Sequence, residues 1–597
     1  MNSISYILKN PEKQQEFFSC KRTYAFSAAL IGAVLFFLIY GIESLWPTNV
    51  SFLYNSTDAD VFNHQLGFDF YRIAPWRNPI GLQSLYPYPY LGSVIYTDSI
   101  PILAFFFKLI SPILPEYFQY FGLWIFICFM LQGVSASLIF KKLGISYTKT
   151  MLCVPFFILN VPFLFRCFHH SALAGQWLIL FSFLLILCEK EMAYRKRAIL
   201  WSLLCFGSIL IQGYLFFCVG FLMSFSCFYQ FIKYKKRGAS VVVFFSCVVF
   251  SVFAYYIGGG MLTHQNIIMG GYPYYLFDPA DLINPLIYSS FLPPIVYLCS
   301  LESSVYWGIA FMALLITAIV FLIIKRKKIA PFYKEHRFIV CLVLLASLFL
   351  FLVSEGIAPR IAGQTLFDLR EVIRDYDTLA ALSTMRSTAR FILPVLYLLQ
   401  LCVFYIICRG IHSRRIFLCV MIPCIVLQYA EIVPRTAKGR ADSIVSGYPH
   451  PFNDSFDRVF NENAKHLSYI TTGYEDIAFA GVFASHHHMS LNTSKACRGP
   501  KNSVQFDVNA WNTGRLSDDT VYLIPDDNVV YLSPQLLPEN YLIYYCDEKL
   551  CIFNKELMQE APPKSAVAMD RETLYSLLEY YYDPALAETP FDTFDSH

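Results

Sequence analysis

Long apolar segments recur along this chain, and they constrain its fold more than any other feature. About 20 helical residues cross the roughly 30 Å of hydrocarbon in a bilayer, and shorter spans occur in bundles of several helices. Ten segments fit this description: 24–46, 118–140, 151–165, 171–188, 199–232, 239–257, 305–324, 338–357, 391–408 and 416–433. Segment 199–232 is too long for one crossing, and we divide it near Gln212 and Gly213. We therefore expect about eleven transmembrane helices.

Composition agrees with a membrane protein. Of the 597 residues, 56% are hydrophobic and only 15% are charged, too few to cover a set of water-soluble domains. The net charge of +3 gives no reason to expect a nucleic-acid partner. Most of the 18 cysteines lie inside apolar runs, where the usual role is that of a small buried hydrophobe, and their spacing is not that of a zinc site. We expect no metal or other cofactor.

Positive charges predict the topology, because Lys and Arg collect in the short cytoplasmic loops of membrane proteins. Clusters of these residues occupy alternate connections, at 141–142, 195–197, 233–237, 325–328 and 409–415. With an odd number of crossings, residues 1–23 lie in the cytoplasm and the C-terminal region lies outside. The run 24–46 is too long for a cleaved signal peptide and is expected to remain as an anchor.

The same topology places three long connections on the outer face, at 47–99, 258–304 and 358–390, within a membrane domain that spans 24–433. These loops are rich in aromatic residues and proline, which favours ordered, functional segments over disordered ones. The segment Ile100–Leu114 is apolar but short, and we expect a re-entrant helix or one that lies on the membrane surface.

A soluble α/β domain is expected from residue 434 to 597. Strand-like stretches occur at Leu467–Thr472, Thr520–Ile524, Val529–Leu532 and Tyr541–Tyr545, and Glu572–Tyr582 resembles a helix. Cys546 and Cys551 flank a predicted hairpin turn. A disulfide in an oxidising compartment and a pair of free thiols are both consistent with this spacing.

Three acidic residues in the first long connection are candidates for a general base. Asp58 and Asp60 follow the first span, and Asp98 precedes the short apolar segment. A carboxylate beside a partly desolvated cleft can have a raised pKa and accept a proton from a sugar hydroxyl. The alternative is structural, since Asp also occurs in loop turns and as a helix N-cap.

Basic residues at two other places are candidates for binding a phosphate. Arg166 and His170 lie in a tight hairpin between two spans, where charge-assisted hydrogen bonds to phosphate oxygens or to lipid headgroups are both plausible roles. Arg386 and Arg390 precede the span at 391, on the side where positive charge is disfavoured. An anionic lipid phosphate would explain them. Salt bridges with nearby acidic residues such as Asp368 are the alternative.

Several motifs resemble those of a bacterial membrane family with the character of GT-C glycosyltransferases. They are Thr57-Asp58, His64-Gln65-Leu66-Gly67, Phe70-Tyr71-Arg72, Pro75-Trp76, Tyr96-Thr97-Asp98-Ser99-Ile100-Pro101, Phe118 to Trp124, Arg166 with His170 to Leu173, Asn284-Pro285 with Ser290 to Pro293, Tyr306-Trp307-Gly308, and Arg386 to Phe391. The matches cover most of the chain. It departs from the expected pattern at Ala389 and at Gln212-Gly213.

The resemblance implies a GT-C-like α-helical polytopic membrane protein with a C-terminal soluble α/β domain. It also implies a catalytic acidic residue in the first outer loop and a donor sugar carried on a polyprenyl phosphate. Carried over to this chain, Asp58 matches the characteristic acidic position, followed by Asp60 and Asp98. The substrate-binding candidates are His64, Arg72, Arg77, Arg166, His170, Arg386 and Arg390.

The function that we expect is therefore inverting transfer of a hexosyl or related sugar to an envelope glycan, such as an O-antigen, at the periplasmic side of a bacterial inner membrane. Its partners would be the polyprenyl-phosphate-linked donor, the glycan acceptor and membrane lipids, with no nucleic acid. Two alternatives belong to other classes. One is a transporter or flippase of a lipid-linked glycan, which would carry ionisable residues near the middle of the bilayer. The other is a non-catalytic envelope assembly protein.

Overall fold

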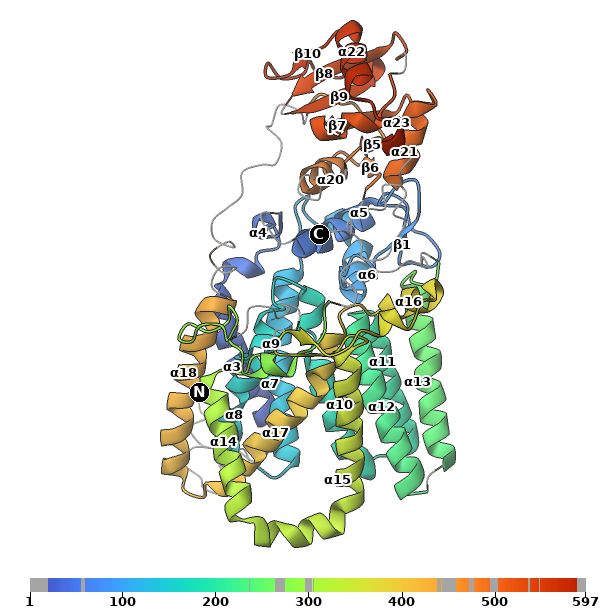
Figure 1. Ribbon diagram of the computed structural model, residues 1–597. Coiled ribbons are helices and arrows are strands. Elements are labelled where there is room, and N and C mark those ends of the chain that lie inside the picture. Colours follow the sequence, from blue (N-terminus) through green and yellow to red (C-terminus); the bar gives the residue numbers. More distant parts are fainter. Residues whose placement is uncertain are drawn as a thin grey trace. The chain divides into compact units, whose positions relative to one another are not determined.

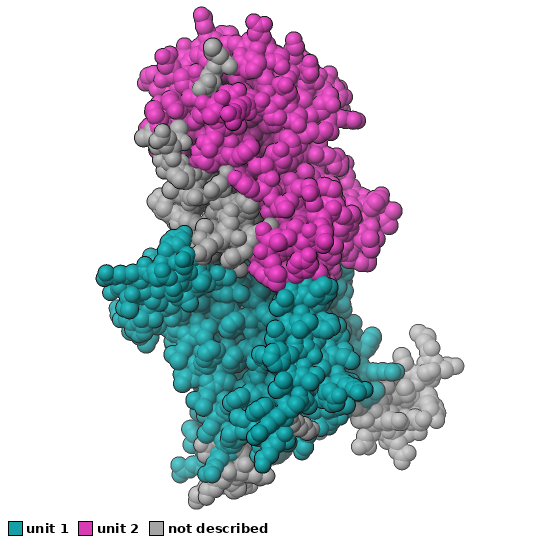
Figure 2. Space-filling model, turned by 90° about the vertical axis from the view of Figure 1, so that its right-hand side faces the viewer, with its two compact units in different colours: residues 1–49, 119–254, 267–445 teal, residues 50–118, 255–266, 446–597 magenta. Residues whose placement is uncertain are grey.

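The computed structural model describes residues 20–54, 59–235, 237–262, 274–295, 303, 305–437, 442, 458–471, 477–493, 503–534, 537–546 and 548–587. The chain forms two compact units that do not follow its order, and Figure 2 shows them in different colours. Unit 1 contains residues 1–49, 119–254 and 267–445, and unit 2 contains residues 50–118, 255–266 and 446–597. The loop between the first two apolar runs is thus grouped with the C-terminal region.

Unit 1 is a helical bundle (Figure 1). Its main helices are α3 (Lys21–Tyr40), α7 (Phe121–Lys142), α8 (Tyr147–Ile158), α9 (Val161–Leu164), α10 (Trp177–Cys188), α11 (Tyr194–Ile209), α12 (Gly213–Lys233), α13 (Arg237–Ile257), α14 (Ile309–Ile324), α15 (Arg326–Glu355), α16 (Tyr376–Ser383), α17 (Leu393–Gly410) and α18 (Arg414–Thr436). The 3-10 turns η3 (Ser171–Ala174) and η4 (Glu189–Glu191) flank α10, η7 (Thr388–Ile392) precedes α17, and η5 (Pro279–Leu282) lies between α13 and α14.

Within the described residues, eight helical segments are long and apolar enough to cross a membrane. They are Lys21–Tyr40, Phe121–Lys142, Ser171–Glu191, Gly213–Lys233, Arg237–Ile257, Arg337–Glu355, Thr388–Gly410 and Arg414–Thr436. This confirms a polytopic helical membrane protein. The other expected crossings correspond to the shorter helices α8, α11 and α14, so the count of eleven stays a prediction.

The long apolar run at 199–232 is divided where the sequence analysis placed the break. Helix α11 ends at Ile209 and α12 begins at Gly213. The side chain of Gln212 accepts a hydrogen bond from Tyr214 N (2.9 Å) and so caps α12. Two glycines bring α3 and α7 together: a Cβ at Gly32 would lie 2.4 Å from Phe129 O, and one at Gly133 would lie 2.8 Å from Ala28 O. Small residues at such crossings permit close backbone contact.

Unit 2 contains a mixed six-stranded sheet in the order β10-β8-β9-β7-β5-β6, which confirms the expected C-terminal α/β region. The strands are β5 (His466–Tyr469), β6 (Ser490–Leu491), β7 (Thr520–Pro525), β8 (Tyr541–Cys546), β9 (Lys549–Asn554) and β10 (Val567–Ala568). Strand β5 is parallel to β6 and β7, and the remaining pairs are antiparallel.

Both faces of this sheet are covered, as the alternation of side chains along each strand requires. One face packs on α21 (Ser503–Asn512) and α22 (Arg571–Tyr581) through residues such as Trp511 and Leu574. The other face packs on α20 (Ile477–His486) and on α5 (Ala59–Ile73), which contributes Phe62, Leu66 and Phe70. Residues of the first long connection therefore complete the core of the C-terminal sheet.

A backbone contact extends the edge of the same sheet. Leu491 of β6 donates to Leu85 O (2.9 Å) and accepts from Tyr88 N (2.8 Å). The remaining elements of the first connection are α4 (Ser51–Tyr54), the hairpin of β1 (Leu82–Gln83) with β2 (Gly92–Ser93), α6 (Pro101–Leu109) and η2 (Ser111–Ile113). The short helix expected at 100–114 is thus present as α6 and η2.

Two expectations for the C-terminal region are settled by the structure. The expected strand at Val529–Leu532 is wrong, because Asp526–Tyr531 forms the 3-10 helix η8. Pairing of β7 with β9 ends at Pro525, and the acidic residues that follow favour a turn. The expected hairpin is present, but Cys551 lies opposite Tyr544 and Cys546 lies opposite Lys549, and both cysteines remain thiols.

Candidate functional site

Two of the arginines singled out from the sequence line one small cavity in unit 1. Arg166 follows α9, and Arg390 belongs to η7, so that distant parts of the chain supply them. The cavity has a volume of about 10 Å³, on the scale of one water molecule. It is lined by Pro162, Arg166, Leu173, Gln176, Ser303, Val305, Ala389, Arg390 and Leu393. The site therefore combines two guanidinium groups with an amide and a hydroxyl.

Arg166 is placed by a hairpin that is closed by side-chain hydrogen bonds. The side chain of Asn160 accepts from Phe163 N (3.0 Å) and caps α9. Gln176 Nε2 donates to Pro162 O (2.6 Å) across the hairpin. The guanidinium of Arg166 lies 5.0 Å from the centre of the Phe165 ring, and only 4% of the residue is exposed. A cation–π contact therefore helps to hold this buried cation.

Arg390 is placed by contacts of η7 with the end of α15 and with Tyr275. Thr388 Oγ1 donates to Ser354 O (3.0 Å), and Ala389 N donates to Tyr275 O (3.2 Å). The guanidinium of Arg390 lies 4.5 Å from the centre of the Tyr214 ring, at the start of α12. Arg390 is thus held from three separate segments of unit 1.

An acidic residue stands behind the cavity wall. The hydroxyl of Ser303, which lines the cavity, donates a hydrogen bond to Asp281 Oδ2. Asp281 is 1% exposed and lies in η5, whose N-cap Asp278 accepts from Ala280 N (2.9 Å). Asp281, Ser303 and Gln176 were not among the candidates selected from the sequence. The capping pattern Asp278-Pro279-Ala280-Asp281 was the one local signal that an ordered turn occurs here.

The other arginines of the loop between α15 and α17 have different surroundings. Arg386 lies over the ring of Tyr275 (5.5 Å). Arg370 lies over the ring of Tyr274 (5.5 Å) and forms a salt bridge with Asp368 (2.6 Å). This pair holds the pKa of Asp368 below its ordinary value and raises the pKa of Arg370. For Arg370 the salt-bridge alternative is therefore correct.

His170 lies on the same hairpin as Arg166. It is buried, and its ring centre is 4.4 Å from that of His169. Its backbone carbonyl accepts from Leu173 N (2.8 Å), which starts the turn η3. A role of His170 in substrate binding stays a prediction.

The acidic candidates belong to unit 2. Asp58 lies outside the described residues, and Asp60 is the second residue of α5. His64 follows one turn later and is buried. Asp98 has a φ of 52° in a turn that is fastened to α5, since Ser99 Oγ donates to His64 O (2.7 Å). The structure thus brings the segments that carry Asp60, His64 and Asp98 into one unit.

Arg72 and Arg77 also lie in unit 2, and their surroundings differ. Arg72 donates to Ser111 Oγ (2.8 Å), Glu116 O (3.0 Å) and Leu114 O (3.1 Å), and so fixes the segment that follows α6. Arg77 is exposed to solvent. The arginine candidates are therefore divided between the two units, and the cavity collects Arg166 and Arg390.

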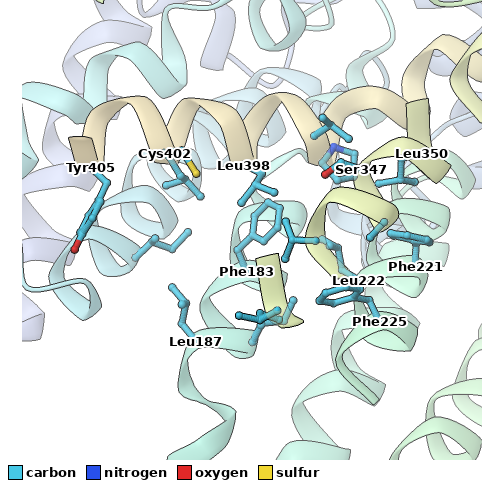
Figure 3. A pocket seen from close by; sticks show the side chains of 18 of the residues that line it. Phe183, Leu187, Phe221, Leu222, Phe225, Ser347, Leu350, Leu398, Cys402 and Tyr405 are labelled. Carbon is cyan, nitrogen blue, oxygen red and sulfur yellow. The ribbon is translucent and has the colours of Figure 1, made fainter. Parts of the chain in front are cut away.

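A much larger cavity of about 560 Å³ lies in unit 1, and its lining is almost entirely apolar. Figure 3 shows Leu398, Cys402 and Tyr405 turned toward the same space as Phe183 and Phe225. The lining residues are Ile139, Leu143, Phe183, Ile186, Leu187, Phe221, Leu222, Phe225, Ile339, Val343, Ala346, Ser347, Leu350, Pro394, Val395, Leu398, Leu401, Cys402, Tyr405 and Ile406. They come from the ends and faces of five helices: α7, α10, α12, α15 and α17.

Consecutive residues of the chain line the two cavities. Leu393 lines the small arginine cavity, and Pro394 and Val395 line the large apolar one. All three lie in the first turn of α17. A polar site and an apolar site are thus built next to each other on one helix.

Fold and site together define a polytopic α-helical membrane protein with a small cavity lined by two arginines and a larger apolar cavity. The chain belongs to the family described as a domain of unknown function (DUF6311), whose model matches residues 29–433. That match includes both cavities and the first long connection, and it ends at the last turn of α18. No curated protein matches the chain.

Proposed function

We propose that this protein is a glycosyltransferase that moves a sugar from a polyprenyl phosphate to an envelope glycan. The observation that carries the proposal is the convergence of Arg166 and Arg390 on one cavity beside Ser303 and Gln176. Guanidinium groups donate charge-assisted hydrogen bonds to phosphate oxygens, and the water-sized cavity would have to widen to admit a phosphate. A phosphate is also the leaving group of the proposed donor.

The apolar cavity supports a lipid as the carrier of that phosphate. Pro394 and Val395 place its lining one residue beyond Leu393 of the cationic cavity. A ligand with an anionic head and a long apolar chain would use both sites at once. Polyprenyl phosphates have this character, and pockets of a few hundred Å³ are of the size that buries part of such a chain.

In the proposed reaction, a hydroxyl oxygen of the acceptor attacks the anomeric carbon, and the bond from that carbon to the phosphate oxygen breaks. The electron pair leaves with the polyprenyl phosphate, whose added charge Arg166 and Arg390 stabilise. An acidic residue of the first connection, Asp58 or Asp60, accepts the hydroxyl proton, with Asp98 as the further candidate. Attack from the face opposite the leaving group inverts the anomeric configuration.

The proposed setting is the periplasmic face of a bacterial inner membrane, with the N-terminus in the cytoplasm and the C-terminal domain outside. The acceptor would be an O-antigen or a similar envelope polysaccharide. His64, Arg72, Arg77, His170 and Arg386 stay candidates for contacts with donor or acceptor.

The test is the composition of envelope glycans, measured by mass spectrometry in a deletion strain. The strain is complemented at matched protein levels with wild type, Arg390→Ala, Asp58→Asn or Asp60→Asn. We expect the deletion to lose one sugar residue, which wild type restores and Arg390→Ala does not. One of the two Asn variants should also fail, which would identify the base. Identical glycans in all strains would overturn the proposal.

A flippase of a lipid-linked glycan is the second candidate, because the apolar cavity would also accept the lipid chain of its cargo. The two functions differ in what accumulates. Loss of a flippase leaves the complete lipid-linked glycan on the cytoplasmic side, whereas loss of the transferase leaves a glycan that lacks one sugar. Mass spectrometry of the lipid-linked fraction from the deletion strain separates them.

A further inference from the structure

Helix α6 of unit 2 exposes apolar side chains and buries a charged one, the opposite of what is usual for a helix in water. Pro101, Ala104 and Lys108 face inward and are buried. On the opposite face, Ile102, Phe106 and Leu109 are 39%, 54% and 70% exposed. Ile113 of the following turn η2 is 82% exposed and continues this apolar row. Within α6, the spacing of four and three residues puts Ile102, Phe106 and Leu109 on one side of the helix.

The buried lysine fixes this orientation. Lys108 Nζ lies 4.1 Å from the ring centre of Tyr71 and 4.5 Å from that of Trp76, and only 4% of the residue is exposed. Lysine normally keeps its ammonium group in water, so two cation–π contacts hold it here against the usual preference. Rotating α6 to hide its apolar row would break both contacts.

The position of α6 in the chain limits what its apolar row can meet. Ile113 precedes Phe121, the first residue of the apolar helix α7, by a connection that spans at most about 28 Å when fully extended. Two hydrogen bonds from Arg72, to Leu114 O and Glu116 O, tie part of this connection to α5. The chain itself thus keeps Ile113 within that distance of the first residue of a helix long and apolar enough to cross a membrane. Trp76, which is 51% exposed next to Lys108, is a residue type enriched at the bilayer interface.

We propose that the apolar row of α6 and η2, formed by Ile102, Phe106, Leu109 and Ile113, lies in the interfacial layer of the lipid bilayer and anchors unit 2 to the membrane surface. Amphipathic helices of this kind bury their apolar face about 5–10 Å below the headgroups. The alternative occupant of such a face, a second copy of this chain, is an outcome of the test. The inference does not depend on the transferase proposal.

The test is photo-crosslinking from the apolar row. p-Benzoylphenylalanine replaces Phe106 in the full chain, which is reconstituted in phospholipid nanodiscs and irradiated. Phe506 of α21 is the matched control, because it is the same residue type with a similar exposure of 49%. The same amino acid at Leu109 provides a second, independent probe.

Lipid adducts are counted by mass spectrometry of the irradiated protein. We expect at least ten times more phospholipid adduct at positions 106 and 109 than at position 506. Equal adduct at all three positions would overturn the proposal. So would a cross-linked product of twice the chain mass without lipid, which would show that a second copy covers the row.

Discussion

Arg370 and Arg390 lie in the same loop between α15 and α17, and their surroundings are opposite. Arg370 is bound by its near neighbour Asp368 at 2.6 Å, in a salt bridge that both residues expose in part to solvent. Arg390 stacks on Tyr214 of a different helix and lines the same small cavity as Arg166. Neutralisation within its own loop favours a structural role for Arg370, whereas the arrival of Arg166 and Arg390 from distant segments at one cavity favours a shared ligand.

The largest effect should follow from removing either cavity arginine. We expect Arg166→Ala and Arg390→Ala each to lower sugar transfer roughly 100-fold, as loss of a charged group that stabilises a leaving group does in other enzymes. Transfer is measured as the rate of sugar incorporation by isolated membranes from complemented strains. Arg370→Ala is the matched control and should stay within about twofold of wild type. Equal losses in Arg370→Ala and Arg390→Ala would remove the distinction between the two regions.

A smaller loss of sugar transfer is expected when the hydrogen bond between Ser303 and Asp281 is removed. Ser303→Ala removes the hydroxyl that lines the cavity and bonds to Asp281. Loss of one such hydrogen bond corresponds to about 1 kcal/mol, so we expect transfer to fall roughly fivefold to tenfold. Ser383→Ala is the control, because Ser383 is also buried but donates to Ala380 O within its own helix (2.8 Å). If both variants behaved alike, Ser303 would have no special place in the site.

The aromatic ring of Tyr214, which lies beneath Arg390, should contribute less to donor binding. Tyr214→Leu removes the cation–π contact, which is worth about 0.5–1 kcal/mol, and should raise the KM for the donor about threefold. Tyr214→Phe keeps the ring and should stay closer to wild type. The KM is measured with the lipid-linked donor in detergent-solubilised protein. An equal loss with Phe and with Leu would show that the hydroxyl, which accepts from Ser387 N (3.1 Å), matters more than the ring.

The smallest expected effect is a pH-dependent change in Tm when Asp368 is replaced. Arg370 lowers the pKa of Asp368, so the folded state favours the ionised carboxylate. The stability that results is present above the ordinary pKa of an aspartate and is lost as the pH falls through the lowered value. Asp368→Asn should therefore lower the Tm slightly at pH 6 and not at all at very low pH. A Tm difference that grew toward low pH would contradict the assigned direction.

The sequence predicted the helices of unit 1 well, because their signals are local. The break at Gln212 follows from an apolar run longer than one bilayer crossing, and the basic residues mark the ends of several helices. The strand expected at Val529–Leu532 is wrong because β7 ends its pairing with β9 at Pro525, and the chain then turns into the 3-10 helix Asp526–Tyr531. Short β-branched stretches form strands only where a partner is present.

The cavity was not predictable as a site, although two of its arginines were selected. Nothing in the spacing of Arg166 and Arg390 indicates that they meet, and Ser303 and Gln176 carry no motif of their own. The union of residues 50–118 with the C-terminal sheet was also missed. A sequence signal existed, since Phe62, Leu66, Phe70 and Ile73 recur every three or four residues, and such an apolar helix face requires a partner to cover it.

That union has a consequence for biosynthesis. The core of unit 2 joins Leu66 and Phe70, made early, to Leu467 and Val521, which the ribosome adds only near the end of synthesis. Until then, α5 has no sheet to cover its apolar side chains, and a chaperone or the membrane surface would have to shield them. A chain shortened at residue 445 would not be a membrane domain lacking an optional appendage. It would be an unfinished protein, whose first loop never receives its core and is open to proteases.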